Sequence, residues 1–253
     1  MTRAWTAIKA RDEIESMRRS SRIVAGTLRL MGSVTRPGVT TGELDRIAED
    51  YIRSSGGLPS FKGYRGFPAS ICASVNSEVV HGIPGKRVLR EGDIISIDVG
   101  VLMEGYHGDG AATFPVGEIG ADAARLLEQT EKALLAGIAE ARDGARVVDI
   151  SRAIQTVVEE AGYSVVRDLV GHGIGREMHE EPAIPNFVAP GPSSLLVAGM
   201  TLAVEPMVSM GGYEIKMLDD AWTYVTKDGA LSAHFEHTIA VNQDGAEMLT
   251  LCG

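Results

Sequence analysis

The same order of elements occurs twice along this chain of 253 residues, and this repeat limits the folds open to it. Each half begins with two segments of helical periodicity and continues into β-prone runs. The segment at Gly38 resembles the one at Gly144, and the strand around Asp98 resembles the strand around Glu205. Because both matches have nearly the same offset, we expect two quasi-symmetric halves that each offer a carboxylate to a site on their common axis.

Helices are followed by strands in each half, which predicts an α+β fold with antiparallel pairing rather than alternating βαβ units. The expected helices cover about residues 14–31, 40–54, 127–138 and 147–161. The expected strands lie at 70–80, 94–100, 111–116, 165–170, 200–208, 222–226 and 234–241. We predict one catalytic domain over residues 1–253, with halves at roughly 12–117 and 118–245.

The composition is that of an ordinary globular protein, with 44% hydrophobic and 23% charged residues. The net charge of -10 gives no reason to expect direct nucleic-acid binding. The two cysteines, Cys72 and Cys252, do not form a disulfide framework and fit a reducing compartment. No apolar run has the ~20 residues that span a bilayer, and the N-terminus lacks a signal-peptide pattern. We therefore expect a cytoplasmic monomer with no membrane association.

Acidic residues interrupt four apolar, β-prone stretches. Asp98 lies in IISIDVG, Asp109 in GYHGDGAATF just before a strand, Glu205 in TLAVEP and Glu236 in AHFEHTIAV. An ionised carboxylate in such a strand is costly without a partner, which a buried Arg or a metal could supply. Four carboxylates that meet would repel one another strongly. Divalent cations are the simplest remedy.

His172 is a fifth candidate ligand, because the glycines of GHGIG allow the backbone to approach a site closely. A lone histidine is more often structural, but beside four strand carboxylates a ligand role is favoured. Four carboxylates and one imidazole suit two divalent ions such as Mn, Fe or Co. Two such ions can share a hydroxide and polarise a carbonyl, which predicts hydrolysis. Cys72 has little support as a nucleophile and is expected to pack in a strand.

Several stretches resemble the type I methionine aminopeptidases of the pita-bread metalloaminopeptidase family. They are FPASICASVNSEVVHGIPG, GDIISIDVG, YHGDGAATF, GHGIGREMHEEP, TLAVEPM and HFEHTIAV. The resemblance covers nearly the whole chain, and the short interval between Glu205 and Glu236 is similar to type I rather than type II. It implies two pseudo-symmetric halves around a curved, mainly antiparallel sheet with helices on the outer face. It also implies removal of the initiator methionine from nascent proteins with a small second residue.

The resemblance assigns roles to the five candidate ligands. Asp109 and Glu236 would bridge two divalent ions. Asp98 would complete one ion, and His172 and Glu205 would complete the other. Glu205 would also accept the proton of the attacking water.

The resemblance also implies the substrate contacts. His179 would bond the scissile carbonyl, and His81 would lie near the scissile nitrogen. The residues that match the methionine pocket are Tyr64, Phe67, Cys72 and Trp222, and Met178 would bind the substrate beside them. Met178 stands where bacterial members usually have Phe, and Phe61 where many have Cys. Asn76 and Ser232 match positions near a monovalent-cation site.

Two alternatives remain open at this point. A proline-specific aminopeptidase or prolidase would share the fold and the ligands. Such enzymes are longer chains with a separate N-terminal domain, whereas the first helix here is expected to begin by about residue 12. A non-catalytic pita-bread binding protein would be expected to lose ligands, and here all five are present together with His81 and His179. The expected partners are nascent polypeptide N-termini, with association with the ribosome as a further expectation.

Overall fold

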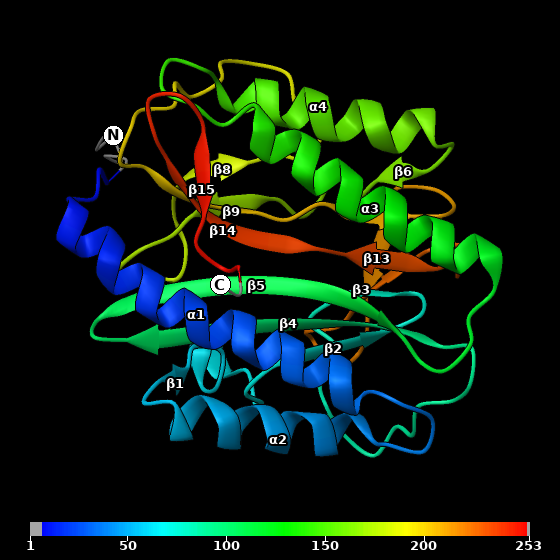
Figure 1. The fold of residues 1–253 in the computed structure, drawn as a ribbon. Coiled ribbons are helices and arrows are strands. Elements are labelled where there is room, and N and C mark those ends of the chain that lie inside the picture. The colour runs from blue at the N-terminus through cyan, green and yellow to red at the C-terminus, as the bar shows by residue number, and fades with distance from the viewer. Residues whose placement is uncertain (1–6, 252–253) are drawn as a thin grey trace.

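A computed structural model describes residues 7–251, so Cys252 lies outside the described part. Within this range the chain forms α-helices packed on a mainly antiparallel sheet, as the sequence predicted (Figure 1). The helices are α1 (Arg11–Val34), α2 (Thr41–Ser54), α3 (Ala121–Ala139) and α4 (Val147–Glu160). Among the described residues, every helix is too short or too polar to cross a lipid bilayer.

The central sheet joins the first and second parts of the chain through β5 and β14. Its order is β1 (Leu58–Pro59), β4 (Ile94–Met103), β5 (Tyr106–Pro115), β14 (Glu236–Val241), β9 (Thr201–Val204), β7 (Gly171–Gly173) and β8 (Glu180–Ile184). β2 (Cys72–Val75) pairs with β4, and β15 (Ala246–Met248) with β14. This order sets β4 and β5 beside β14 and β9, while the division into halves at 12–117 and 118–245 stays a prediction.

Two small antiparallel sheets flank the central one. The first contains β6 (Ser164–Val165), β10 (Met207–Ser209) and β13 (Ser232–His234). The second contains β3 (Glu78–Val80), β11 (Ile215–Met217) and β12 (Tyr224–Thr226).

The predicted capping box opens α2. The Thr40 hydroxyl accepts the Glu43 N–H at 3.2 Å, and the Glu43 carboxylate accepts the Thr40 N–H at 2.8 Å. These two bonds satisfy donors that a helix N-terminus leaves free. They fix the start of a helix whose apolar face packs beside α1.

Each pair of helices covers its own hydrophobic core. Val24 of α1 and Leu44 of α2 share a cluster with Ile97 of β4. Ile154 of α4 shares another cluster with Leu202 of β9, in the second part of the chain. Burial of one such side chain contributes about 1.5–3 kcal/mol. The two cores therefore anchor the strands that carry the acidic residues.

Side-chain alternation in β4 and β5 turns the acidic residues away from α1 and α2. Ile97 and Val99 of β4 pack toward these helices, as does Phe114 of β5. Successive side chains of a strand point to opposite faces. Asp98 and Asp109 therefore face the other side of the sheet.

Several strand boundaries differ from those predicted. The expected strand at 200–208 is interrupted, because β9 ends at Val204 and Pro206 has no N–H for a sheet ladder. Glu205 thus follows a strand and is not inside one. Asp109 lies inside β5, which begins at Tyr106, and not before the strand.

Three further expected strands are shorter or divided. The one at 70–80 is split by a turn at Asn76, whose φ is 60°. The one at 234–241 breaks at Phe235, and the one at 165–170 contains only the last residue of β6. β8, which begins at Glu180, was not predicted, since EEPAI has too little alternation to mark a strand.

Candidate metal centre

Strand register brings the acidic residues together. Ala111 of β5 pairs with Asp98 on one side and with Glu236 on the other. Asp109 lies two residues before Ala111 and so faces the same side of the sheet. The three carboxylates come from three adjacent strands at one level, and Glu205 joins them from the end of β9.

His172 on β7 presents an unprotonated nitrogen to this cluster. Its Nδ1 lies 2.9 Å from the Gly173 carbonyl, which can only accept, so Nδ1 carries the proton of the neutral ring. Nε2 then faces the Glu205 Oε1 at 3.4 Å. Two acceptors at this distance require a proton or a cation between them.

The geometry and the unpaired atoms of the cluster fit metal ions. Ligand atoms of Asp109, His172 and Glu236 all lie within 4.8 Å of one another. Asp98 Oδ1 and Glu236 Oε1 are buried without a hydrogen-bond partner among the described residues. A buried carboxylate oxygen left in this state is costly. A set of oxygen donors with one imidazole is the kind that divalent transition metals bind.

Burial of the cluster changes its protonation. Desolvation raises the pKa of Asp98 to about 7. Desolvation and then the neighbouring carboxylates raise the pKa values of Asp109, Glu205 and Glu236 well above their usual range. Asp98 is therefore partly protonated at pH 7, and cations compete with protons for the cluster.

We expect the affinity for Mn or Co to rise as the pH increases from 6 to 8, because the ions must displace protons from the carboxylates. Each displaced proton changes the apparent binding constant by about tenfold per pH unit. Calorimetric titrations in two buffers of different ionisation enthalpy would count the protons released. An affinity that is the same at pH 6 and pH 8 would contradict the assignment of these carboxylates as ligands.

The acidic cluster borders a cavity of about 170 Å³. The predicted residues that line this cavity are Tyr64, Phe67, Cys72, His81, Asp98, Asp109, His172, Met178, His179, Glu205, Trp222 and Glu236. The structure therefore gathers the candidate ligands, the two other histidines and the candidate methionine pocket around one space. Phe61 lines it as well.

The apolar wall is built from aromatic and sulfur-containing side chains. The Phe67 and Trp222 rings meet edge to face, with centroids 5.1 Å apart. Phe61 and Met178 pack in the same cluster. Burial, and next the carboxylate of Asp98, raise the pKa of Cys72 well above that of a free thiol. This thiol stays protonated, so it is an inert wall residue and a poor nucleophile, as predicted.

Two histidines lie beside the ligands. His179 Nδ1 is 2.8 Å from the Tyr64 hydroxyl, and its ring centroid is 4.3 Å from that of His172. Burial, and next His172, lower the pKa of His179 to about 3. Burial also lowers the pKa of His81, whose ring centroid is 6.4 Å from that of Trp222. Both rings are therefore neutral at pH 7.

Arg65 and His234 lie near the cluster but were not predicted from the sequence. Arg65 lines the cavity, with its guanidinium carbon 5.3 Å from the centroid of the Tyr64 ring. His234 is buried with both ring nitrogens unpartnered among the described residues, and its Nε2 lies 3.8 Å from Glu205 Oε2. Its place two residues before Glu236 is a signal that could have found it. For Arg65, the sequence carries no comparable signal.

Comparison with known proteins identifies the family. The profile of Metallopeptidase family M24 matches residues 15–243. A methionine aminopeptidase from Clostridium acetobutylicum is 54% identical, over 97% of this chain and 98% of the relative. The chain belongs to the methionine aminopeptidases of family M24. Membership of a metallopeptidase family supports the use of divalent metal, and Asp109, His172 and Glu236 lie close enough together to hold an ion.

Solved structures agree with this assignment. The methionine aminopeptidase of Thermotoga maritima superposes with a TM-score of 0.96 at 44% identity, covering 98% of this chain and 100% of the other. The predicted pita-bread fold is thereby confirmed. An Xaa-Pro dipeptidase from Bacillus anthracis gives a TM-score of 0.79 at 24% identity, and the chain covers only 63% of it. The similarity to that longer enzyme shows the fold alone.

Proposed function

We propose that this protein removes the N-terminal initiator methionine from nascent proteins and peptides whose second residue is small. The observation that supports this most is that one cavity is lined both by the five candidate ligands and by an apolar wall that includes Phe67, Met178 and Trp222. Relatives of high identity carry the name methionine aminopeptidase. The reaction is hydrolysis of the first peptide bond.

Two divalent ions are the proposed cofactors, with Co, Mn and Fe as candidates. The residues that would hold them are Asp98, Asp109, His172, Glu205 and Glu236. When bound, the ions supply Lewis acidity toward the scissile carbonyl and lower the pKa of water. The resemblance to type I methionine aminopeptidases implies that Asp109 and Glu236 would each contact both ions.

The side chains around the ligands have proposed roles in the reaction. Glu205 accepts the proton of the attacking water. When the Tyr64 hydroxyl donates to His179 Nδ1, the neutral ring keeps a proton on Nε2 and can donate it to the scissile carbonyl. His81 lies near the scissile nitrogen. Both histidines act as neutral groups, which their lowered pKa values favour.

We also propose a monovalent-cation site and a place for the enzyme in the cell. Asn76 and Ser232, joined by a 2.9 Å bond from the Ser232 N–H to the Asn76 carbonyl, are proposed to lie at a monovalent-cation site. We place the enzyme in the cytoplasm as a monomer that meets nascent N-termini at the ribosome. The net charge of -10 argues that this meeting does not depend on direct nucleic-acid binding.

Specificity tests the proposal. The peptide Met-Ala-Ser is expected to be cleaved, whereas Met-Leu-Ser and Ala-Pro peptides are not. A peptide that begins with norleucine should be accepted, because an apolar pocket discriminates one methylene-sized change by only ~1–3 kcal/mol. The measurement is kcat/KM for each peptide with Mn- or Co-loaded protein. Equal turnover of N-terminal Met and Lys would contradict the pocket assignment, and preference for Ala-Pro would favour the prolidase alternative.

A further inference from the structure

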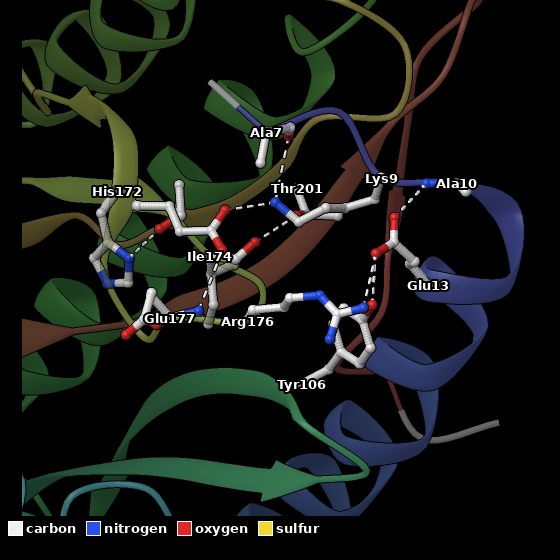
Figure 2. A network of polar contacts seen from close by, with 12 residues as sticks. Ala7, Lys9, Ala10, Glu13, Tyr106, His172, Ile174, Arg176, Glu177 and Thr201 are labelled. Atoms are coloured by element: carbon white, nitrogen blue, oxygen red, sulfur yellow. Dashed lines mark hydrogen bonds and ion pairs between the residues drawn. The ribbon is translucent and has the colours of Figure 1, made fainter. Parts of the chain in front are cut away.

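The connection between β7 and β8, which carries Met178 and His179, is held from outside the cavity by the segment that precedes α1. The Lys9 N–H donates to the Gly199 carbonyl at 2.8 Å. Figure 2 shows the Lys9 side chain extending from this segment into the network that includes Thr201 and Glu177. That side chain is only 5% exposed. A lysine is rarely buried to this degree without a charged partner.

The partner of Lys9 is Glu180, the residue after His179. Lys9 Nζ lies 2.5 Å from Glu180 Oε2, and the Glu180 side chain is 14% exposed. The second oxygen of this carboxylate, Oε1, accepts the Glu177 N–H at 3.2 Å. One carboxylate therefore ties together both ends of the segment 177–180, and the lysine fixes that carboxylate.

Gly175 allows this close packing. A Cβ atom at this position would lie 2.3 Å from Lys9 Cε and 2.7 Å from Glu180 Oε1. The Gly175 carbonyl accepts the His107 N–H at 2.8 Å, which ties the connection to β5. Glu13 of α1 adds a second anchor, because it accepts from the Tyr106 hydroxyl at 2.6 Å and from Arg176 at 3.3 Å (Figure 2). The connection is thus fixed on the side away from the cavity.

We propose that Lys9, acting through Glu180, is a positioning residue for His179. Lys9 does not line the cavity, and its ion pair with Glu180 connects it to the segment 177–180. This inference rests on the proposed role of His179 at the scissile carbonyl. A displacement of about 1 Å in such a donor, caused by a change far from the chemistry, can cost ~10²-fold in rate.

A double-mutant cycle tests the proposal. Lys9→Met removes the ammonium and keeps most of the side-chain volume. We expect it to lower kcat for Met-Ala-Ser by about 10- to 100-fold, with KM and metal content nearly unchanged. In the His179→Ala background, Lys9→Met should lower kcat by less than about twofold, because the group that it positions is already absent.

The control is Arg152→Met, which removes an exposed ion pair with Asp149 on α4. It should leave kcat within about twofold of the wild type. Thermal unfolding of each variant identifies the temperatures at which kinetics report folded protein. A Lys9→Met variant with wild-type kcat, or with the same loss in both backgrounds, would overturn the proposal and leave Lys9 as a purely structural residue.

A second readout does not depend on the proposed reaction. The His179 imidazole resonance, assigned by its absence in His179→Ala, is expected to shift and broaden in Lys9→Met and not in Arg152→Met. An unchanged resonance would overturn the positioning role even if activity fell. If the wild-type protein fails to cleave Met-Ala-Ser while the resonance shifts as expected, the proposed function is wrong and the link from Lys9 to His179 stands.

Discussion

Asp109→Ala and Glu236→Ala are each expected to reduce cleavage of Met-Ala-Ser by more than ~10³-fold. Loss of a single transition-state donor already costs ~10²–10³-fold, and these carboxylates are proposed to bind both ions. The measurement is steady-state kinetics beside metal content by mass spectrometry. Chelation of the wild type should give the same loss, and Mn, Co or Fe should reverse it. Full activity in a rigorously metal-free sample would rule out the metal mechanism.

The carboxylates that activity is expected to require are also expected to destabilise the metal-free protein. The raised pKa of a buried acid means that the folded protein binds more protons than the unfolded chain, so its contribution to stability is lost as the pH rises through the folded-state value. For Asp98 that value is about 7. Metal-free wild type should therefore be less stable at pH 8 than at pH 6. Metal-free Asp109→Asn should unfold at least about 3 °C higher than the wild type at pH 8, because the neutral amide cannot add a charge to the buried acidic cluster. A lower unfolding temperature would contradict the repulsive cluster.

His172→Ala and His179→Ala are expected to fail in different ways. His172→Ala should weaken metal binding by at least ~100-fold, since even partners of ligands contribute ~10–100-fold, and excess metal should partly restore activity. His179→Ala should keep its metals and lower kcat by ~10²–10³-fold, since its bond to the carbonyl forms mainly in the transition state. The decisive comparison is metal stoichiometry beside kcat for both variants.

His81→Ala serves as the companion variant, because His81 also lines the cavity and is not assigned as a ligand. It should resemble His179→Ala in keeping its metals. If His179→Ala loses its metals while His172→Ala retains them, the two roles are exchanged and the assignment of both histidines is wrong.

The main elements of the site could be predicted because local pattern and burial agree there. Asp98 stands between apolar residues in a strand, and only a partner in the fold makes that placement tolerable. The spacing of apolar residues identified the helices, and the capping box located the start of α2. Each of these signals is contained in a short stretch of the sequence, so it can be recognised without knowledge of the fold.

Other features depend on contacts that no local pattern encodes. β9 ends at Val204, because Pro206 has no N–H for the sheet ladder. Glu205, which was expected inside a strand, therefore lies just beyond one. The two strands that meet at Ala111 come from distant parts of the chain, and their register is set by packing on both sides. The pair between Lys9 and Glu180 joins residues far apart in the sequence, and in the sequence each looks like an ordinary surface charge.

The pairing of β5 with β14 also has a consequence for how the protein assembles. Ala111 and Glu236 lie far apart in the sequence, and Ile239 and Val241, on the same strand as Glu236, belong to the core of the second part of the chain. Contacts of such long sequence separation slow folding, since the chain loses loop entropy before it gains the pairing. At pH 8 and without cations, this pairing also brings together carboxylates whose charges repel one another. At pH 8, divalent ions present during refolding should therefore speed folding, and Asp109→Asn should fold faster than the wild type without them.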